Sequence, residues 1–387
     1  MRILRPLVPR DPHEDHRVAT PLELFTDLCF VVAIAQAAGA MHHEASAGHI
    51  GQGLVHFFMV FFAIWWAWLN FAWFSSAYDN DDVFHRVMTL VQVAGSLILA
   101  AGVPRLFEDD FTLVVVGYVV MRIALVIQWL RAAQSHPEGR ATALRYAFGI
   151  TAVQVLWVGY QFVPDDSKPW FFLLGVAAEI SVPVWAERAG TTPWHPHHIA
   201  ERYGLFLIIV LGETVLSTTF AIQEAIDGDY PVAELAGIVI GGLLIIFSAW
   251  WLYFSREAGE LLTGNDVGYL WGFGHYFIFA SGALIGAGLA ARVDYLTHHS
   301  EGLSDIASSA LVTGPAAAFL AALWIILVRL HDPSVRTWGP FALAIVLILG
   351  STFVPGTVLI AGLICVALLV VELRVTEFGR TSVSPSV

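Results

Sequence analysis

The sequence predicts an all-α integral membrane protein, with about twelve transmembrane helices arranged as two parallel six-helix repeats and both termini cytoplasmic. Of its 387 residues, 57% are hydrophobic and 13% are charged, whereas soluble domains are about 45–50% apolar and about 25% charged. Apolar stretches of roughly 20 residues, the length that crosses a bilayer, follow one another along the whole chain. This composition excludes a disordered or nucleic-acid-binding protein and leaves no loop long enough for a soluble catalytic domain.

The elements follow in order from these stretches. A polar opening, MRILRPLVPRDPHEDHR, has no cleavable signal pattern, so residues 1–21 are expected to form a cytoplasmic segment. A first half, 22–190, and a second half, 191–373, precede a cytoplasmic tail, 374–387. The last two stretches are short, and a re-entrant hairpin is the alternative there. The expected spans are 22–41, 53–76, 84–103, 111–131, 142–163, 169–186, 201–223, 232–255, 267–291, 306–329, 338–354 and 356–373.

The distribution of Lys and Arg predicts the orientation. Fifteen of the 19 basic residues lie on the amino-terminal side of the spans, and three (Arg105, Lys168 and Arg292) lie on the opposite side. Cytoplasmic loops carry such an excess. Both termini are therefore expected in the cytoplasm, with the lipid bilayer of the cytoplasmic membrane as the immediate partner.

A repeat is visible between the two halves. AIWWAWLNF, with Trp65 and Trp66, resembles FSAWWLYFS, with Trp250 and Trp251, and GSLILAAG (95–102) resembles SGALIGAG (281–288). The first and seventh spans each begin with an acid, Glu23 or Glu201, and carry a second polar group, Gln36 or Glu213, about twelve residues later. Two halves of like orientation are common among transporters. Chance similarity between apolar segments is the alternative.

Seven stretches in matching order resemble the bacterial low temperature requirement protein A (LtrA) family, from about residue 18 to about residue 290. They are TPLELFTDLCFVVAIAQ (20–36), WWAWLNFAWFSSAYDNDD (65–82), VPRLF, GYVVMRIALVIQWLRA (117–132), HPHHIAERYGLFLIIVLGETV (195–215), AWWLYFSREAGE (249–260) and YLWGFGHYFIFASGALIGAG (269–288). The resemblance implies an integral membrane protein without indicating a substrate. Family members often carry Asp where this chain has Glu179. The residues that the family motif covers are Glu201, Arg202, Gly204, Gly212, Trp65, Trp66, Trp250 and Trp251.

A second, shorter resemblance concerns the first span. Phe25-Thr26-Asp27 is similar to the Phe-Ser-Asp of a non-canonical potassium channel family that also uses six-helix repeats, although Pro21 stands where that family has Arg. The resemblance covers one helix and implies a cation channel as an alternative function.

Charged side chains inside spans are rare and are usually paired or functional. Glu213 lies twelve residues beyond Glu201, about 18 Å deeper along a helix, and Gly212 beside it is expected to admit another helix or a ligand. Glu213 is a candidate proton carrier or cation ligand, with a hydrogen-bonded packing role as the alternative. Glu23 and Asp27, four residues apart, share a helix face that suits a proton or a cation, although the dipole of the helix also favours acids there.

Arg122 keeps its charge and therefore needs an acid. Glu179 is the first candidate, with Asp27 and Glu213 as alternatives, in a structural pair or in one that breaks and re-forms. Asn70 shares a face with aromatic side chains that either line a cavity or pack. His275 is a candidate pH sensor.

These residues predict a transporter, or an ion- or proton-coupled permeation protein, of unknown solute. Its path runs through Glu213, Asp27, Arg122 and Glu179 at the interface between the halves. No cofactor, metal or nucleic acid is expected, and the oligomeric state stays open. The alternatives are a cation channel and an intramembrane enzyme acting on lipid, with acid–base or metal chemistry from Asp79, Asp81, Asp82, His195, His197 and Glu201.

Overall fold

The computed structural model describes residues 4–11, 14, 17–228, 230–300 and 302–381. All regular secondary structure within these ranges is helical, which confirms the all-α prediction. The remainder of the predicted terminal segments, including Arg2 and residues 382–387, lies outside the described residues.

Each of the twelve predicted spans coincides with a helix. The long helices are α1 (Pro21–Ser46), α2 (Ile50–Tyr78), α3 (Val83–Phe107), α4 (Thr112–Ser135), α5 (Arg140–Tyr160), α6 (Lys168–Ala186), α7 (Pro196–Asp227), α8 (Val232–Phe254), α9 (Asn265–Leu296), α10 (Asp305–Leu323), α12 (Val335–Ser351) and α13 (Thr357–Thr381). A π-helical turn, Trp324–Val328, and α11, Arg329–His331, extend α10.

Eleven helices in the described part of the chain are long and apolar enough to cross a membrane. α12 is the exception among the twelve, because its 17 residues extend about 26 Å, less than the roughly 30 Å of the hydrocarbon core. A crossing by α12 therefore stays a prediction.

The chain divides into two compact units. Unit 1 comprises Met1–Ala37 and His56–Arg202, and unit 2 comprises Ala38–Val55 and Tyr203–Val387. The hairpin between α1 and α2 thus groups with unit 2, and α7 begins in one unit and continues in the other. The boundaries of these units follow the contacts between residues. The predicted halves, 22–190 and 191–373, therefore stay a prediction.

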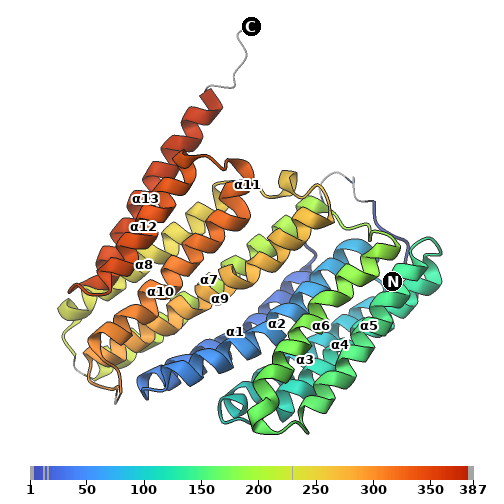
Figure 1. Cartoon of the computed structure of the whole chain (residues 1–387), viewed down its shortest axis with the longest axis horizontal. Coiled ribbons are helices and arrows are strands. Elements are labelled where there is room, and N and C mark those ends of the chain that lie inside the picture. The colour runs from blue at the N-terminus through green and yellow to red at the C-terminus, as the bar shows by residue number, and fades with distance from the viewer. Residues whose placement is uncertain (1–3, 12–13, 15–16, 229, 301, 382–387) are drawn as a thin grey trace. The chain divides into compact units, whose positions relative to one another are not determined.

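In unit 1, α3, α4, α5 and α6 follow one another as neighbours (Figure 1). Glycines bring α3 and α4 close together: a Cβ added at Gly95 would lie 3.0 Å from the backbone nitrogen of Met121, and one at Gly102 would lie 2.8 Å from that of Val114. Small residues allow such close helix contacts inside membranes. α2 contributes large side chains that are fully buried, among them Trp66 and Trp68.

In unit 2, α9 packs on α10, and α8 packs on α13 (Figure 1). A Cβ added at Gly241 of α8 would overlap the carbonyl oxygen of Val358. A Cβ added at Gly237, one turn earlier, would have no heavy atom from another element of the described chain within 4 Å. Of these two glycines, therefore, only Gly241 makes a close contact with a neighbouring helix.

Candidate functional site

A cluster of charged side chains lies inside unit 1, where α1, α2 and α7 meet. We call it the carboxylate–arginine cluster. Glu23 is 1% exposed, and Asp27, His198 and Arg202 are 0% exposed. Its members are Glu23 and Asp27 of α1, His198 and Arg202 of α7, and Trp68 of α2.

Equivalent positions on two helices supply opposite charges to this cluster. α1 begins at Pro21 and α7 at Pro196, so Glu23 and His198 are each the third residue of their helix, and Asp27 and Arg202 are each the seventh. Residues four apart share a helix face. An acidic face on α1 therefore meets a basic face on α7.

Arg202 joins the two carboxylates. Its Nη2 donates to Asp27 Oδ1 at 2.5 Å and its Nε to Asp27 Oδ2 at 3.3 Å, in the paired geometry that suits guanidinium and carboxylate. Its Nη1 lies 2.9 Å from Glu23 Oε1. One guanidinium thus serves both acids.

Further donors hold the carboxylates in place. Trp68 Nε1 donates to Asp27 Oδ1 at 2.7 Å. Glu23 Oε2 accepts from the backbone nitrogen of Thr20 at 2.8 Å, and the Glu23 backbone nitrogen donates back to Thr20 Oγ1 at 3.3 Å. This reciprocal pair is a capping box, so the start of α1 itself orients Glu23 towards Arg202.

The named members of this cluster carry one more negative than positive charge when His198 is neutral, and the buried Arg17 nearby interacts electrostatically with Glu23 and His198. Two carboxylates face one guanidinium, and the remaining group, the His198 imidazole, lies with Nε2 3.3 Å from Glu23 Oε2. Its Nδ1 has no hydrogen-bond partner among the described residues. Since an uncompensated buried charge is strongly unfavourable, the cluster suits one additional proton or a small cation.

A second cluster surrounds Glu179 at the middle of α6. Tyr118 Oη donates to Glu179 Oε1 at 2.6 Å, Trp66 Nε1 to Oε2 at 2.8 Å and Trp157 Nε1 to Oε1 at 3.1 Å. Arg122 Nη2 lies 3.4 Å from Glu179 Oε2 and also donates to Tyr118 Oη. Of the three acids considered for Arg122, the structure pairs it with Glu179.

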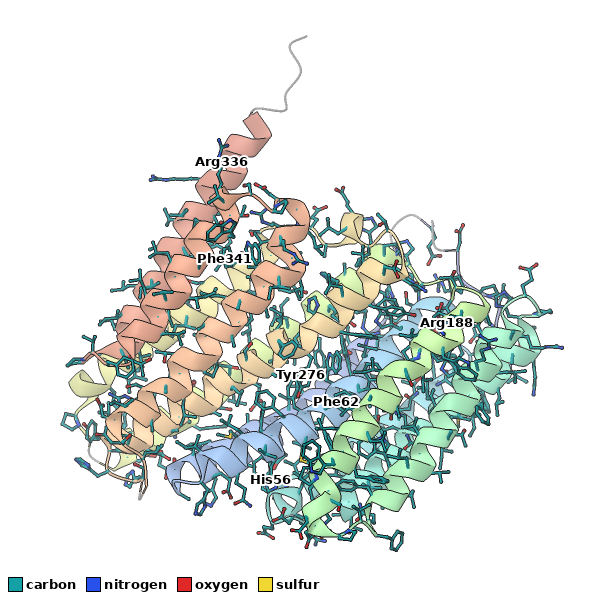
Figure 2. The ribbon with its side chains drawn as sticks, in the orientation of Figure 1. His56, Phe62, Arg188, Tyr276, Arg336 and Phe341 are labelled. Atoms are coloured by element: carbon teal, nitrogen blue, oxygen red, sulfur yellow. The ribbon has the colours of Figure 1, made fainter. Side chains whose placement is uncertain are left out.

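Tyr118 connects this second cluster to an apolar pocket. The phenol ring forms part of the wall of the pocket, together with Phe62, Leu106, Trp157 and Phe172; Phe62 is labelled in Figure 2. Because hydrocarbon side chains line it, the pocket suits an apolar group rather than an ion.

Other predicted path residues have simpler surroundings. Gln36 is exposed. Asn70 donates to the carbonyl oxygen of Trp66, one turn earlier, at 2.8 Å. His275 is fully buried, with Nδ1 2.6 Å from the Trp271 carbonyl oxygen and Nε2 2.9 Å from Tyr253 Oη, so both ring nitrogens are engaged.

Glu213 lies in unit 2 and is half-buried. Ser217 Oγ donates to its Oε1 at 3.1 Å. Gly212 beside it is exposed, and a Cβ there would have no heavy atom from another element of the described chain within 4 Å. Of the two partners expected at Gly212, another helix or a ligand, no helix packs there within the described chain.

Two further residues of the family motif, Gly204 and Glu201, each contact one neighbouring residue. Gly204 packs near Phe254, whose ring would lie 3.0 Å from an added Cβ. Glu201 accepts from the backbone nitrogen of Ala19 at 3.2 Å.

The two Trp pairs differ in their surroundings. Trp65 and Trp66 are 2% and 0% exposed, whereas Trp250 and Trp251 are 45% and 49% exposed. The sequence similarity between these helices therefore does not extend to burial.

The residues suggested for lipid chemistry are engaged in separate interactions. Arg86 donates to both carboxylate oxygens of Asp81 at 2.7 and 2.8 Å, His195 Nε2 lies 2.9 Å from the Glu14 carbonyl oxygen, and His197 is exposed. Among the described residues, no group of three His, Cys, Asp or Glu side chains could hold a metal ion.

Asp82 anchors the amino-terminal segment to the loop between α2 and α3. It pairs with Arg131 and accepts from the backbone nitrogen of Arg5 at 2.7 Å. Burial raises the pKa of Asp82, but hydrogen bonds from Arg131 and from backbone N–H groups outweigh that effect and hold the pKa below its usual value. Asp82 therefore stays charged at neutral pH.

Sequence reasoning missed several partners of the buried acids. It identifies Arg202 only as part of a family motif, and it assigns no role to His198 or Tyr118. The signals were the four-residue spacing of His198 and Arg202 and the position of Tyr118 one turn before Arg122.

Eleven helices of spanning length, with charged clusters buried between them, define a multi-pass helical membrane protein. The chain belongs to the bacterial low temperature requirement A protein (LtrA) family, whose model matches residues 18–373. The match thus continues through the last three helices, beyond the predicted limit near residue 290.

An uncharacterized protein of Rhizobium meliloti (strain 1021) is 24% identical over 254 residues, covering 63% of this chain. The match spans 60% of the length of that relative. No solved structure matches the chain.

Proposed function

We propose that the protein is a transporter that moves protons or a small cation across the cytoplasmic membrane. The observation that supports this most directly is the carboxylate–arginine cluster. Two buried carboxylates share one guanidinium, an arrangement that suits the uptake of one further positive charge. Acids inside spans are typical of proton and cation pathways.

The proposed orientation gives this cluster access to one side of the membrane. Fifteen basic residues on the amino-terminal side favour both termini in the cytoplasm. Asp27 and Arg202 each lie six residues, about 9 Å, into their helices, so the cytoplasm is the nearer aqueous phase. In the proposal, ions enter there, and Glu213 of unit 2 remains a separate candidate carrier. The two six-helix repeats remain part of this proposal.

The lipid-enzyme alternative gains no support from the side chains suggested for it. They form separate pairs with Arg86, Arg131 and backbone groups, and acid–base catalysis needs groups that converge on one reacting position.

Asp27→Asn is the variant that tests the proposal. It leaves Glu23 and Arg202 as a balanced pair, so we expect the cluster to fold without an additional proton. Purified protein in vesicles with an internal pH dye should relax an imposed pH gradient, and Asp27→Asn should lower the rate at least tenfold. Repeating the assay with Na⁺ or K⁺ as the only gradient, and with an internal dye for that cation, distinguishes a cation from a proton.

The matched control is Asp166→Asn, because Asp166 is an exposed acid in the loop before α6. It should transport at the wild-type rate, and Glu213→Gln should be slower. Wild-type vesicles that relax no proton, Na⁺ or K⁺ gradient, or an Asp27→Asn variant that transports normally, would overturn the proposal.

A further inference from the structure

A stripe of polar side chains runs along the buried face of α3. Its members are four, three and four residues apart, which places them on one face of the helix. They are 1%, 0%, 2% and 1% exposed, in chain order. The stripe consists of His85, Thr89, Gln92 and Ser96.

Most of these side chains have polar atoms without a hydrogen-bond partner in the part of the chain that the structure describes. On α3 these atoms are His85 Nδ1, Thr89 Oγ1 and Gln92 Nε2. On α4 they are both amide atoms of Gln128 and the Nε and Nη1 atoms of Arg122. Gln128 is 0% and Arg122 is 1% exposed. Buried polar groups of this kind are normally satisfied by protein or by ordered water.

The register of α3 and α4 places the residues that carry these atoms at matching heights along the two helices. The glycine contacts fix an antiparallel pairing in which Gly95 lies level with Met121, and Gly102 with Val114. Continuing that register puts Gln92 level with Ala124, two residues or about 3 Å from Arg122 along the axis. Thr89 falls level with Ile127, one residue from the height of Gln128.

The two ends of this row differ in exposure. At one end, His85 Nε2 lies 3.5 Å from Asp79 Oδ1, and the Asp79 side chain is 6% exposed. Asp81, two residues further along the same loop, has a side chain that is 57% exposed. At the other end, Ser96 and Gln92 reach the level of Arg122 and its partner Glu179. The row thus extends from the surface loop to the ion pair in the middle of the bundle.

We propose that these side chains line a file of hydrogen-bonded water that connects the loop at Asp79 with the Arg122–Glu179 pair. We call it the polar column, defined by His85, Thr89, Gln92 and Ser96 of α3 and Arg122 and Gln128 of α4. Water fits because each unpartnered atom needs a small molecule that can both donate and accept. A bare cation does not fit, since Arg122 lies at the inner end and neither α3 nor α4 carries a carboxylate between the two ends.

The polar column is separate from the carboxylate–arginine cluster. Its residues belong to α3 and α4, and it would be hydrated whether or not the protein transports ions through Asp27. Water access can therefore be measured without a transport assay.

Cysteine accessibility tests the polar column. Cys29 and Cys365, which are free and buried, are first replaced by alanine. Single cysteines then replace Thr89, Gln92 and Ser96, and the protein in vesicles is treated with methyl methanethiosulfonate, a small uncharged reagent that reacts with the thiolates that form where water reaches a cysteine. We expect all three to react at least tenfold faster than Leu99→Cys, a control on the same helix that is 0% exposed and faces Gly117.

A second variant separates a continuous water file from local openings. Gln92→Leu in the Ser96→Cys protein roughly keeps the side-chain volume but removes the polar atoms between Ser96 and the loop, so labelling of Ser96→Cys should fall at least tenfold. The matched control is Leu90→Ala in the same Ser96→Cys protein. Because Leu90 lies on the exposed face of α3, this change should leave the labelling rate unaltered.

Rates for Thr89→Cys and Gln92→Cys equal to that of Leu99→Cys would overturn the proposal. So would labelling of Ser96→Cys that Gln92→Leu does not slow. Neither result depends on ion flux, so failure of the polar column and failure of the proposed transport are distinguishable.

Discussion

Arg202 decides the charge balance of the carboxylate–arginine cluster. It is fully buried and contacts both Glu23 and Asp27. Its planar guanidinium serves two carboxylates at once, which the single ammonium of a lysine cannot do with the same geometry. The four-residue spacing of the acids would be unfavourable without it.

We therefore predict that Arg202→Gln destabilises the protein by about 3–5 kcal/mol, the usual effect of removing one partner from a buried ion pair. Denaturant unfolding of the purified protein in detergent measures this change. Combining Arg202→Gln with Glu23→Gln and Asp27→Asn removes all three of these charges and should restore most of the stability. A single variant as stable as wild type would contradict the role assigned to Arg202.

At the scale of elements, helix contacts depend on where a glycine meets the backbone of a neighbour. Gly241 and Gly237 are one turn apart on α8, yet only Gly241 touches α13. Backbone atoms cannot rotate away as a side chain does, so a methyl group at Gly241 must separate the two helices.

Gly241→Ala should destabilise the protein by about 1–3 kcal/mol through overpacking. Gly237→Ala is the matched control: alanine favours the helix by about 1 kcal/mol over glycine, and nothing described lies near the new methyl group. Thermal unfolding in detergent should give a lower midpoint for Gly241→Ala and an equal or higher one for Gly237→Ala. The reverse order would show that α8 and α13 do not pack as described.

For the whole molecule, the number of crossings determines the side on which the chain ends. Eleven helices of the described chain meet the length for a span, and α12 has 17 residues. Twelve crossings place both termini on one side, whereas eleven place them on opposite sides. The position of the carboxyl terminus thus reports whether α12 crosses.

We predict that the carboxyl terminus is cytoplasmic. Alkaline phosphatase, which is active only outside the cytoplasm, should be inactive when fused there and active when inserted after Asp166. A green fluorescent protein at the carboxyl terminus should fluoresce. An active phosphatase at the carboxyl terminus would show that α12 does not span.

The sequence by itself determined the helices and the residues that carry charge inside them. Runs of apolar residues long enough to cross a bilayer are a property of each segment alone, so all twelve predicted stretches coincide with helices. The family could also be recognised from the sequence, because its motifs are short stretches of consecutive residues.

Only the tertiary structure decided which charges meet. Helical periodicity gives the face on which a residue lies, but not the helix opposite that face, so Arg122 had three candidate acids until α6 was placed beside α4. For the same reason, the sequence did not predict that Asp27 pairs with Arg202, 175 residues later. Nor did it predict that Trp66 is buried whereas Trp250 is exposed. Contacts between distant segments depend on how helices pack, and sequence spacing does not encode that packing.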